Sequence, residues 1–147
     1  MSDLLSSLGL SQLAKIGDLL QRRKNVAERL LDRLAGSPYF DLPSVLSGNV
    51  HTWHLFVVRL NLERLTIDRD RFIKALAAEN IGCSVHFIPV HRHPFFKPYG
   101  VTAGDYPQCN EYYERCVSLP IFPDMTENDV DDVVTALDRI ARYYSKK

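Results

Sequence analysis

The 147-residue chain has no net charge, few cysteines and no long apolar run, and each of these absences excludes a class of protein. Eighteen Lys and Arg residues balance eighteen Asp and Glu residues, so the chain lacks the positive field through which proteins find nucleic acids and anionic membranes. The three cysteines, Cys83, Cys109 and Cys116, are an odd number without close pairing, which favours reduced thiols. The apolar run at residues 55–58 stops at Arg59, far short of the ~20 residues of a membrane span. We therefore expect a cytoplasmic protein with neither nucleic-acid nor membrane partners.

Sequence motifs of several enzyme classes are also missing. The chain has no G-x-S-x-G nucleophile elbow, no Walker-type glycine loop and no obvious pair of acid–base carboxylates. His51 and His54 are three residues apart in a predicted strand, so we expect them on opposite faces, unable to chelate one ion. His91 and His93 could reach one side of a loop, but no further ligand stands at the spacing of a zinc site. The residues therefore predict no metal site.

Residues 2–35 have the apolar periodicity of one long helix that ends at Gly36. At 1.5 Å per residue this helix would span ~50 Å, which exceeds the ~38 Å diameter of a globule of this chain length. It would therefore overhang its domain with a leucine-rich face exposed, as is typical of an interface. We infer that Met1 is an internal methionine of a longer protein, or that the helix docks onto a second subunit. The alternative is a helix broken near Gly17 and packed back on itself as a hairpin.

The remaining residues, 37–147, alternate between strand-like and helix-like patterns. The predicted strands or extended segments are residues 51–60, 83–88 and 117–123, the last confined to a sheet edge by Pro120. The predicted helices are residues 66–82, 107–116 and 126–144, the last opening with a capping box at Thr126 and Asp129. These patterns predict an α+β fold, in which a small mixed or antiparallel sheet of about three strands has helices on one face.

His86 is the strongest candidate for a ligand-binding residue. It stands on the less apolar side of its predicted strand, shortly before a loop that carries His91, Arg92 and His93. Imidazole and guanidinium groups that converge on a pocket suit an anionic or hydroxyl-rich ligand. The competing interpretation is that His86 lies at the rim of the core, bonded to a backbone carbonyl. The residues alone leave both interpretations open.

Three strings, in chain order, resemble the DegT/DnrJ/EryC1/StrS aminotransferases. They are the opening MSDLLSSLGLSQLAKI with Arg22-Arg23-Lys24, the run NIGCSVHFIPVH at residues 80–91, and SLPIFPDMT at residues 118–126. The resemblance covers essentially the whole chain. It implies that residues 1–36 are the long helix joining two domains and that residues 37–147 are the small C-terminal α+β domain of a fold-type-I enzyme. The upstream cofactor-binding domain is absent from this sequence.

This resemblance implies a homodimeric, pyridoxal-phosphate-dependent enzyme. Members typically move an amino group from an amino acid, usually glutamate, to a keto group of a nucleotide-linked sugar in polysaccharide or amino-sugar biosynthesis. The lysine that binds the cofactor lies in the upstream domain of the family, and Lys15, Lys24, Lys74 and Lys97 do not match its context. We therefore expect no catalytic or cofactor-binding residue in this chain, which should be inactive and free of pyridoxal phosphate by itself. We also expect a homodimer formed through the first helix.

The resemblance further implies that this chain contributes to the substrate site. In relatives the residue that matches His86 and the loop through His91 approach the sugar nucleotide, so His86, His91, Arg92 and His93 are predicted substrate-binding residues. Two alternatives remain open. The chain could be a stand-alone interaction module that dimerises through its leucines, or part of a sugar dehydratase of the same family, in which histidine replaces the cofactor lysine.

Overall fold

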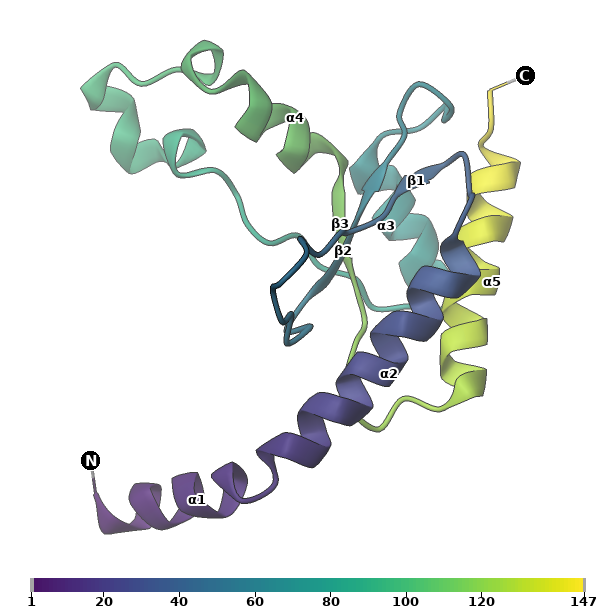
Figure 1. The fold of residues 1–147 in the computed structure, drawn as a ribbon. Coiled ribbons are helices and arrows are strands. Elements are labelled where there is room, and N and C mark those ends of the chain that lie inside the picture. Colours follow the sequence, from purple (N-terminus) through teal and green to yellow (C-terminus); the bar gives the residue numbers. More distant parts are fainter. Residues whose placement is uncertain (1, 147) are drawn as a thin grey trace.

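Three short antiparallel strands and three long helices form the body of the molecule (Figure 1). The structure is a computed structural model that describes residues 2–146, apart from the side chains of residues 97 and 103. The elements are α1 (Asp3–Leu13), α2 (Ile16–Leu34), β1 (Phe40–Asp41), β2 (Phe56–Leu60), α3 (Arg69–Ala78), η1 (Val90–Arg92), η2 (Pro94–Tyr99), η3 (Ala103–Asp105), α4 (Pro107–Arg115), β3 (Cys116–Leu119) and α5 (Glu127–Tyr143). Within residues 2–146 no helix is both long and apolar enough to cross a membrane.

The sheet has the strand order β1-β2-β3, with every pairing antiparallel. This confirms the predicted α+β fold and its small sheet, but the strands differ from those expected. The third strand is β1, whereas the predicted strand at residues 83–88 is reduced to a single bridge between Ser84 and Ser118. The pairing cannot extend in one direction because Pro120, just after β3, has no N–H to donate.

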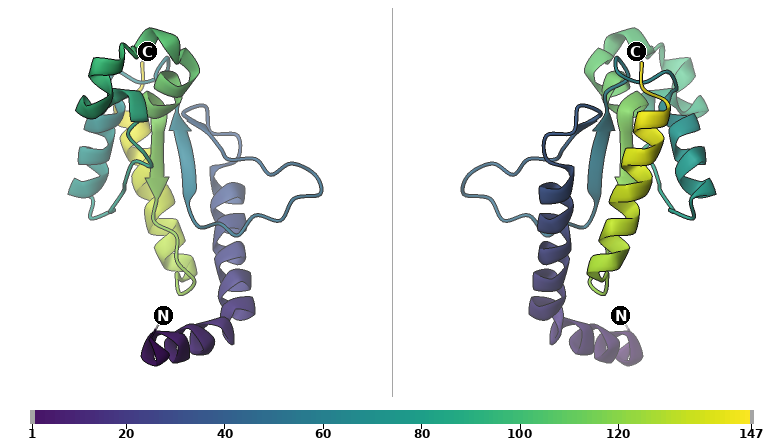
Figure 2. Two further views of the ribbon diagram at one scale, coloured as in Figure 1. Left: turned by 90° about the vertical axis from the view of Figure 1, so that its left-hand side faces the viewer. Right: turned by 90° about the vertical axis from the view of Figure 1, so that its right-hand side faces the viewer.

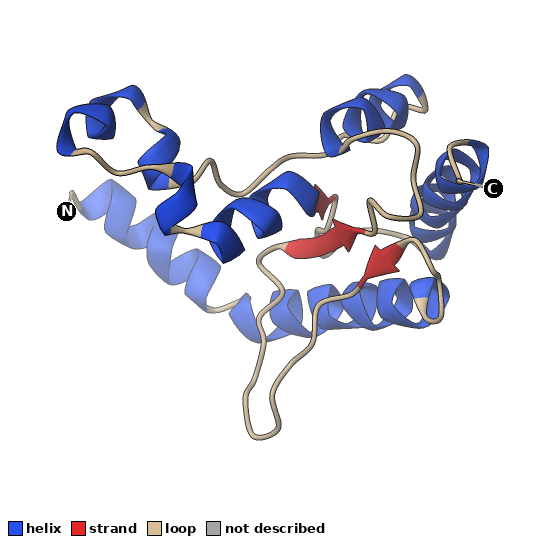
Figure 3. Ribbon diagram, turned by 90° about the horizontal axis from the view of Figure 1, so that it is seen from above, coloured by secondary structure: helices blue, strands red, loops and turns tan. Residues whose placement is uncertain are grey.

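Helices α2, α3 and α5 cover one face of the sheet (Figure 3). The alternation of β2 turns Phe56 and Val58 into this core and leaves Arg59 on the other face. The apolar stripes of α2 and α5 complete the core with Leu30, Leu137 and their neighbours. The predicted placement of the helices on one face is therefore confirmed. The opposite face is overlain only in part, by the end of α4 and by the long loop between β1 and β2, which projects from the body (Figure 2).

The predicted N-terminal helix is two helices. It breaks at Ala14 and Lys15, where the N–H of Lys15 bonds to the carbonyl of Gln12 and tightens the last turn of α1. The break thus lies two to three residues before Gly17, and Gly17 lies inside the first turn of α2. The hairpin alternative is wrong, because α1 contains no buried residue and its leucines remain exposed, Leu4 to 84%. The overhang is therefore real, although it is kinked (Figure 1).

Helix α5 begins at the predicted capping box. The Thr126 hydroxyl accepts a hydrogen bond from the N–H of Asp129, and the Asp129 carboxylate accepts from the N–H and the hydroxyl of Thr126, both at 2.7 Å. The hydrogen bond from the Thr126 backbone, followed by the one from its side chain, lowers the pKa of Asp129 below its usual value.

We expect Asp129→Asn to reduce the pH dependence of stability in acid. A lowered folded-state pKa contributes stability that is complete above the unfolded pKa and is lost as the pH falls through the folded one. The measurement is the urea midpoint from roughly pH 6 to pH 2. Asp132→Asn is the matched control, because Asp132 lies on the same helix outside the capping box. Equal acid dependence in wild type and Asp129→Asn would contradict the prediction.

Candidate functional site

A long loop leaves α3, passes the edge of β3 and runs through η1, η2 and η3 to α4 (Figure 1). This loop carries all four predicted substrate-binding residues. Helix α4 ends at Arg115 and β3 begins at Cys116, so the two form one continuous segment. Polar and aromatic side chains along this segment hold the loop: Tyr106, Asn110, Tyr113, Glu114 and Ser118.

His86 is anchored to β3. Its Nδ1 lies 2.8 Å from the hydroxyl of Ser118, a buried residue in the middle of the strand. The alternative of a bond to a backbone carbonyl is therefore not what the structure has, since the partner is a side-chain hydroxyl. The ring of Phe87 packs edge-on against the imidazole, with 4.7 Å between the ring centroids. His86 is half-buried.

His91 and Arg92 are held by α4. The Nε2 of His91 lies 3.0 Å from Oδ1 of Asn110, and the ring stacks on Tyr106 at 5.1 Å between centroids. Arg92 donates from Nε to the same Oδ1 at 2.7 Å and from Nη2 to Glu114 at 2.7 Å. Its guanidinium also lies 4.9 Å from the centroid of the Tyr113 ring.

His93 does not join this cluster. It is exposed at the end of η1, where its backbone N–H bonds to the carbonyl of Val90. The structure therefore brings His86, His91 and Arg92 onto the α4–β3 segment and leaves His93 outside.

Arg69 extends the cluster toward α3. It is buried, it donates to Asp70 at 2.5 Å, and its guanidinium lies 4.7 Å from the centroid of the Tyr113 ring. Burial acts to lower the pKa of Arg69, but hydrogen bonds and charges from Tyr113 and Asp70 outweigh it and raise the pKa. Tyr113 thus contacts two permanent cations, which link the loop to the core helix α3.

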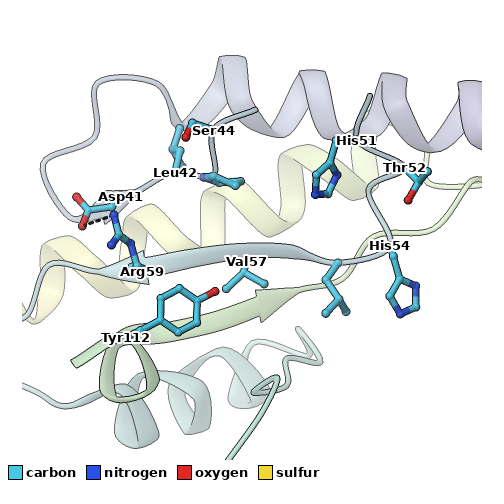
Figure 4. A pocket seen from close by; sticks show the side chains of 11 residues that line it. Asp41, Leu42, Ser44, His51, Thr52, His54, Val57, Arg59 and Tyr112 are labelled. Carbon is cyan, nitrogen blue, oxygen red and sulfur yellow. Dashed lines mark ion pairs between the residues drawn. The ribbon is translucent and has the colours of Figure 1, made fainter. Parts of the chain in front are cut away.

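A second group of residues lines a hollow of about 480 Å³ on the open face of the sheet (Figure 4). Asp41 pairs there with Arg115 at 2.6 Å and with Arg59 at 3.6 Å, and the Tyr112 ring lies beside Val57. Sequence reasoning missed this hollow. The only signal for it was the alternation of β2, which turns Val57 and Arg59 away from the core.

His51 and His54 both line this hollow, and the prediction that they lie within a strand is wrong. They precede β2 instead of lying within it, and the N–H of Trp53 donates to Nδ1 of His51 at 2.9 Å. Among the described residues, no three His, Cys, Asp or Glu side chains are grouped so that they could hold a metal ion.

Among the described side chains, the cysteines and lysines do not form a reactive centre. Burial raises the pKa of the Cys83 thiol to about 11, so this thiol stays protonated at neutral pH. All three cysteines are free. Lys24 and Lys74 are exposed on helix surfaces, Lys15 is exposed in the turn between α1 and α2, and the side chain of Lys97 lies outside the described part of the chain.

Comparisons with known proteins agree with this geometry. The model of the DegT/DnrJ/EryC1/StrS aminotransferase family matches residues 1–138. Protein MJ1066 of Methanocaldococcus jannaschii is 41% identical over 95% of this chain and 36% of its own length. The spore coat polysaccharide biosynthesis protein SpsC of Bacillus subtilis is 40% identical over 97% of this chain and 37% of its own length. The PLP-form of the putative sugar aminotransferase Spr1654 from Streptococcus pneumoniae superimposes with a TM-score of 0.89 at 28% identity, over 97% of this chain and 36% of that one.

The chain thus spans a little over one third of the length of the relatives it matches. The match is nonetheless continuous along nearly all of its own residues, in both sequence and structure. The chain belongs to the DegT/DnrJ/EryC1/StrS aminotransferase family.

Proposed function

We propose that this chain is the C-terminal part of a pyridoxal-phosphate-dependent enzyme that transfers an amino group from an amino acid to a keto group of a nucleotide-linked sugar. The observation that carries the proposal is the match of 97% of the chain to 36% of a sugar aminotransferase in its PLP-form. The name of SpsC supports a role in polysaccharide biosynthesis. On this proposal residues 1–36 are the interdomain helix, residues 37–147 are the small domain, and glutamate is the amino donor.

Among the described side chains, none fits the cofactor itself. Pyridoxal phosphate needs a lysine for its aldehyde, but Lys24 and Lys74 are exposed on helices, Lys15 is exposed in the turn between α1 and α2, and Lys146 donates to the carbonyl of Leu62. When bound, the cofactor supplies the electron sink for amino transfer, and the rest of the protein must hold it. The chain by itself should therefore be inactive.

What this chain supplies is a wall that faces the sugar nucleotide. His86 and His91 offer imidazole nitrogens, Arg92 holds the turn that carries His91 through Asn110 and Glu114, and His93 is exposed at the end of η1. Fixed polar groups of this kind orient a sugar against a reactive centre and raise the effective concentration of the reacting atoms. We assign the uncovered leucines of α1 to a homodimer of this cytoplasmic enzyme.

These same leucines also support a second candidate function, a stand-alone module that dimerises through α1. Exposed apolar side chains on successive turns are typical of an unpartnered interface. Under this alternative the chain has no enzymatic role and no upstream partner domain.

Comparing this chain with the polypeptide that continues upstream in the same reading frame tests the proposal. We expect the longer protein, supplied with pyridoxal phosphate, to develop the visible absorption of the cofactor–lysine imine and to aminate a nucleotide-linked keto sugar at the expense of glutamate. The 147-residue chain should do neither. Loss of water from the sugar without amino transfer would identify a dehydratase instead. An imine band in the short chain, or a stop codon directly upstream, would contradict the proposal, and the stop codon would favour the module.

A further inference from the structure

Asn110 connects two of the predicted substrate-binding residues. It is 8% exposed on the inner face of α4, and its Oδ1 lies 3.0 Å from Nε2 of His91 and 2.7 Å from Nε of Arg92. We propose that Asn110 is a positioning residue that fixes the proton of neutral His91 on Nε2, which leaves Nδ1 as an acceptor for a sugar hydroxyl. The part of this inference that concerns the ligand rests on the proposed function, whereas the part that concerns the proton does not.

The orientation of the Asn110 amide follows from its neighbours. Arg92 Nε carries a hydrogen in every accessible protonation state, so the atom that it contacts must be an acceptor, namely Oδ1. The amide nitrogen Nδ2 then donates to the carbonyl of Tyr106 at 2.9 Å. In the flipped orientation, Nδ2 would point its hydrogens at the N–H of Arg92, and Oδ1 would face the carbonyl oxygen of Tyr106. Both hydrogen bonds would then be lost.

This orientation decides the tautomer of His91. Its Nε2 faces an oxygen that has no hydrogen to give, so the contact is a hydrogen bond only if Nε2 itself is the donor. A neutral imidazole has one N–H, and the proton on Nε2 leaves a lone pair on Nδ1. The partner of one ring nitrogen therefore sets what the other nitrogen can offer.

The tautomer in turn selects the ligand group. A lone pair on Nδ1 accepts a hydrogen bond from a hydroxyl and is repelled by the oxygens of a phosphate, which are themselves acceptors. Arg92 is committed in a similar way, because Nε binds Asn110 and Nη2 binds Glu114. On this inference His91 recognises a sugar hydroxyl, and Arg92 mainly holds the turn that carries His91.

Nitrogen NMR of the histidine rings tests the proton assignment on this chain. We expect the spectrum of His91 to show a proton on Nε2 that exchanges slowly with water. Asn110→Leu removes the acceptor and should abolish the slow exchange, whereas Asn110→Asp keeps an oxygen and should restore it. Asn25→Leu, on the exposed side of α2, is the control for a general effect of this substitution. A wild-type proton on Nδ1, or an unchanged His91 signal in Asn110→Leu, would overturn the inference.

Kinetics of the longer protein test the role toward the ligand. Asn110→Leu should raise KM for the nucleotide sugar about tenfold with little change in kcat, the effect of one lost hydrogen bond to a fixed group, and Asn110→Asp should recover most of the loss. A lowered kcat at unchanged KM would refute the hydroxyl-reading role. If the longer protein transfers no amino group, the proposed function fails, and the NMR result alone still decides whether Asn110 positions His91.

Discussion

Phe72→Ala should remove ~3–5 kcal/mol from the free energy of unfolding, which is the usual cost of truncating a buried aromatic ring. Phe72 is 0% exposed on α3 and packs edge-to-face against Phe40, with 6.0 Å between the ring centroids. It therefore joins the helical layer to β1, a strand of only two residues. Since domains of this size have a total stability of ~5–15 kcal/mol, the loss is a large fraction of it. Urea unfolding followed by circular dichroism measures the effect.

Phe95→Ala is the matched control for this experiment. Phe95 is the same residue type but is 70% exposed in η2, so its truncation should change stability by no more than ~0.5 kcal/mol. If Phe72→Ala does not fold, Phe72→Leu leaves a smaller cavity and should give an intermediate loss. Equal stability of the Phe72→Ala and Phe95→Ala proteins would show that α3 does not pack as described.

If the proposed function holds, His86→Ala in the longer protein should raise KM for the nucleotide sugar about tenfold or more, through the loss of one hydrogen bond to the sugar or its phosphate. The absorption of the bound cofactor should stay unchanged, since the proposed function places the cofactor in the upstream domain. Steady-state kinetics at a fixed glutamate concentration provide the measurement.

Ser118→Ala separates the function of His86 from its support. This variant keeps the imidazole and removes only the hydroxyl 2.8 Å from Nδ1, so we expect a smaller rise in KM than for His86→Ala. Unchanged kinetics in His86→Ala, accompanied by a loss of stability, would reduce His86 to a structural histidine at the edge of the sheet.

The sequence predicted the helices better than the strands. The signals that start α3, α4 and α5 are local in the sequence. They are the N-cap residue Asp68, Pro107 in the first turn, and the capping box of Thr126 and Asp129. The strands depend instead on partners far along the chain. Residues 83–88 have the composition of a strand, but β3 offers them only one bridge beside Pro120, whereas β1 forms from two residues without a clear strand pattern.

The candidate site was predicted only in part, because its contacts also join residues far apart in the chain. His86, His91 and Arg92 stood out by residue type, but nothing local showed that Asn110 lies beneath two of them. Asn110 and Glu114 are one turn apart on a short helix, a spacing that is equally typical of a solvated surface. Which interpretation holds is decided by the course of the preceding loop, and long loops have little regular patterning to read.

Because α4 continues directly into β3, the loop residues held by α4 are rigidly connected to the sheet. With no linker between Arg115 and Cys116, a tilt of the helix must be transmitted to a strand whose four residues are all buried, and a rigid interior resists it. If the proposed function holds, distant substitutions that loosen this interior should therefore weaken binding of the sugar nucleotide before they unfold the protein.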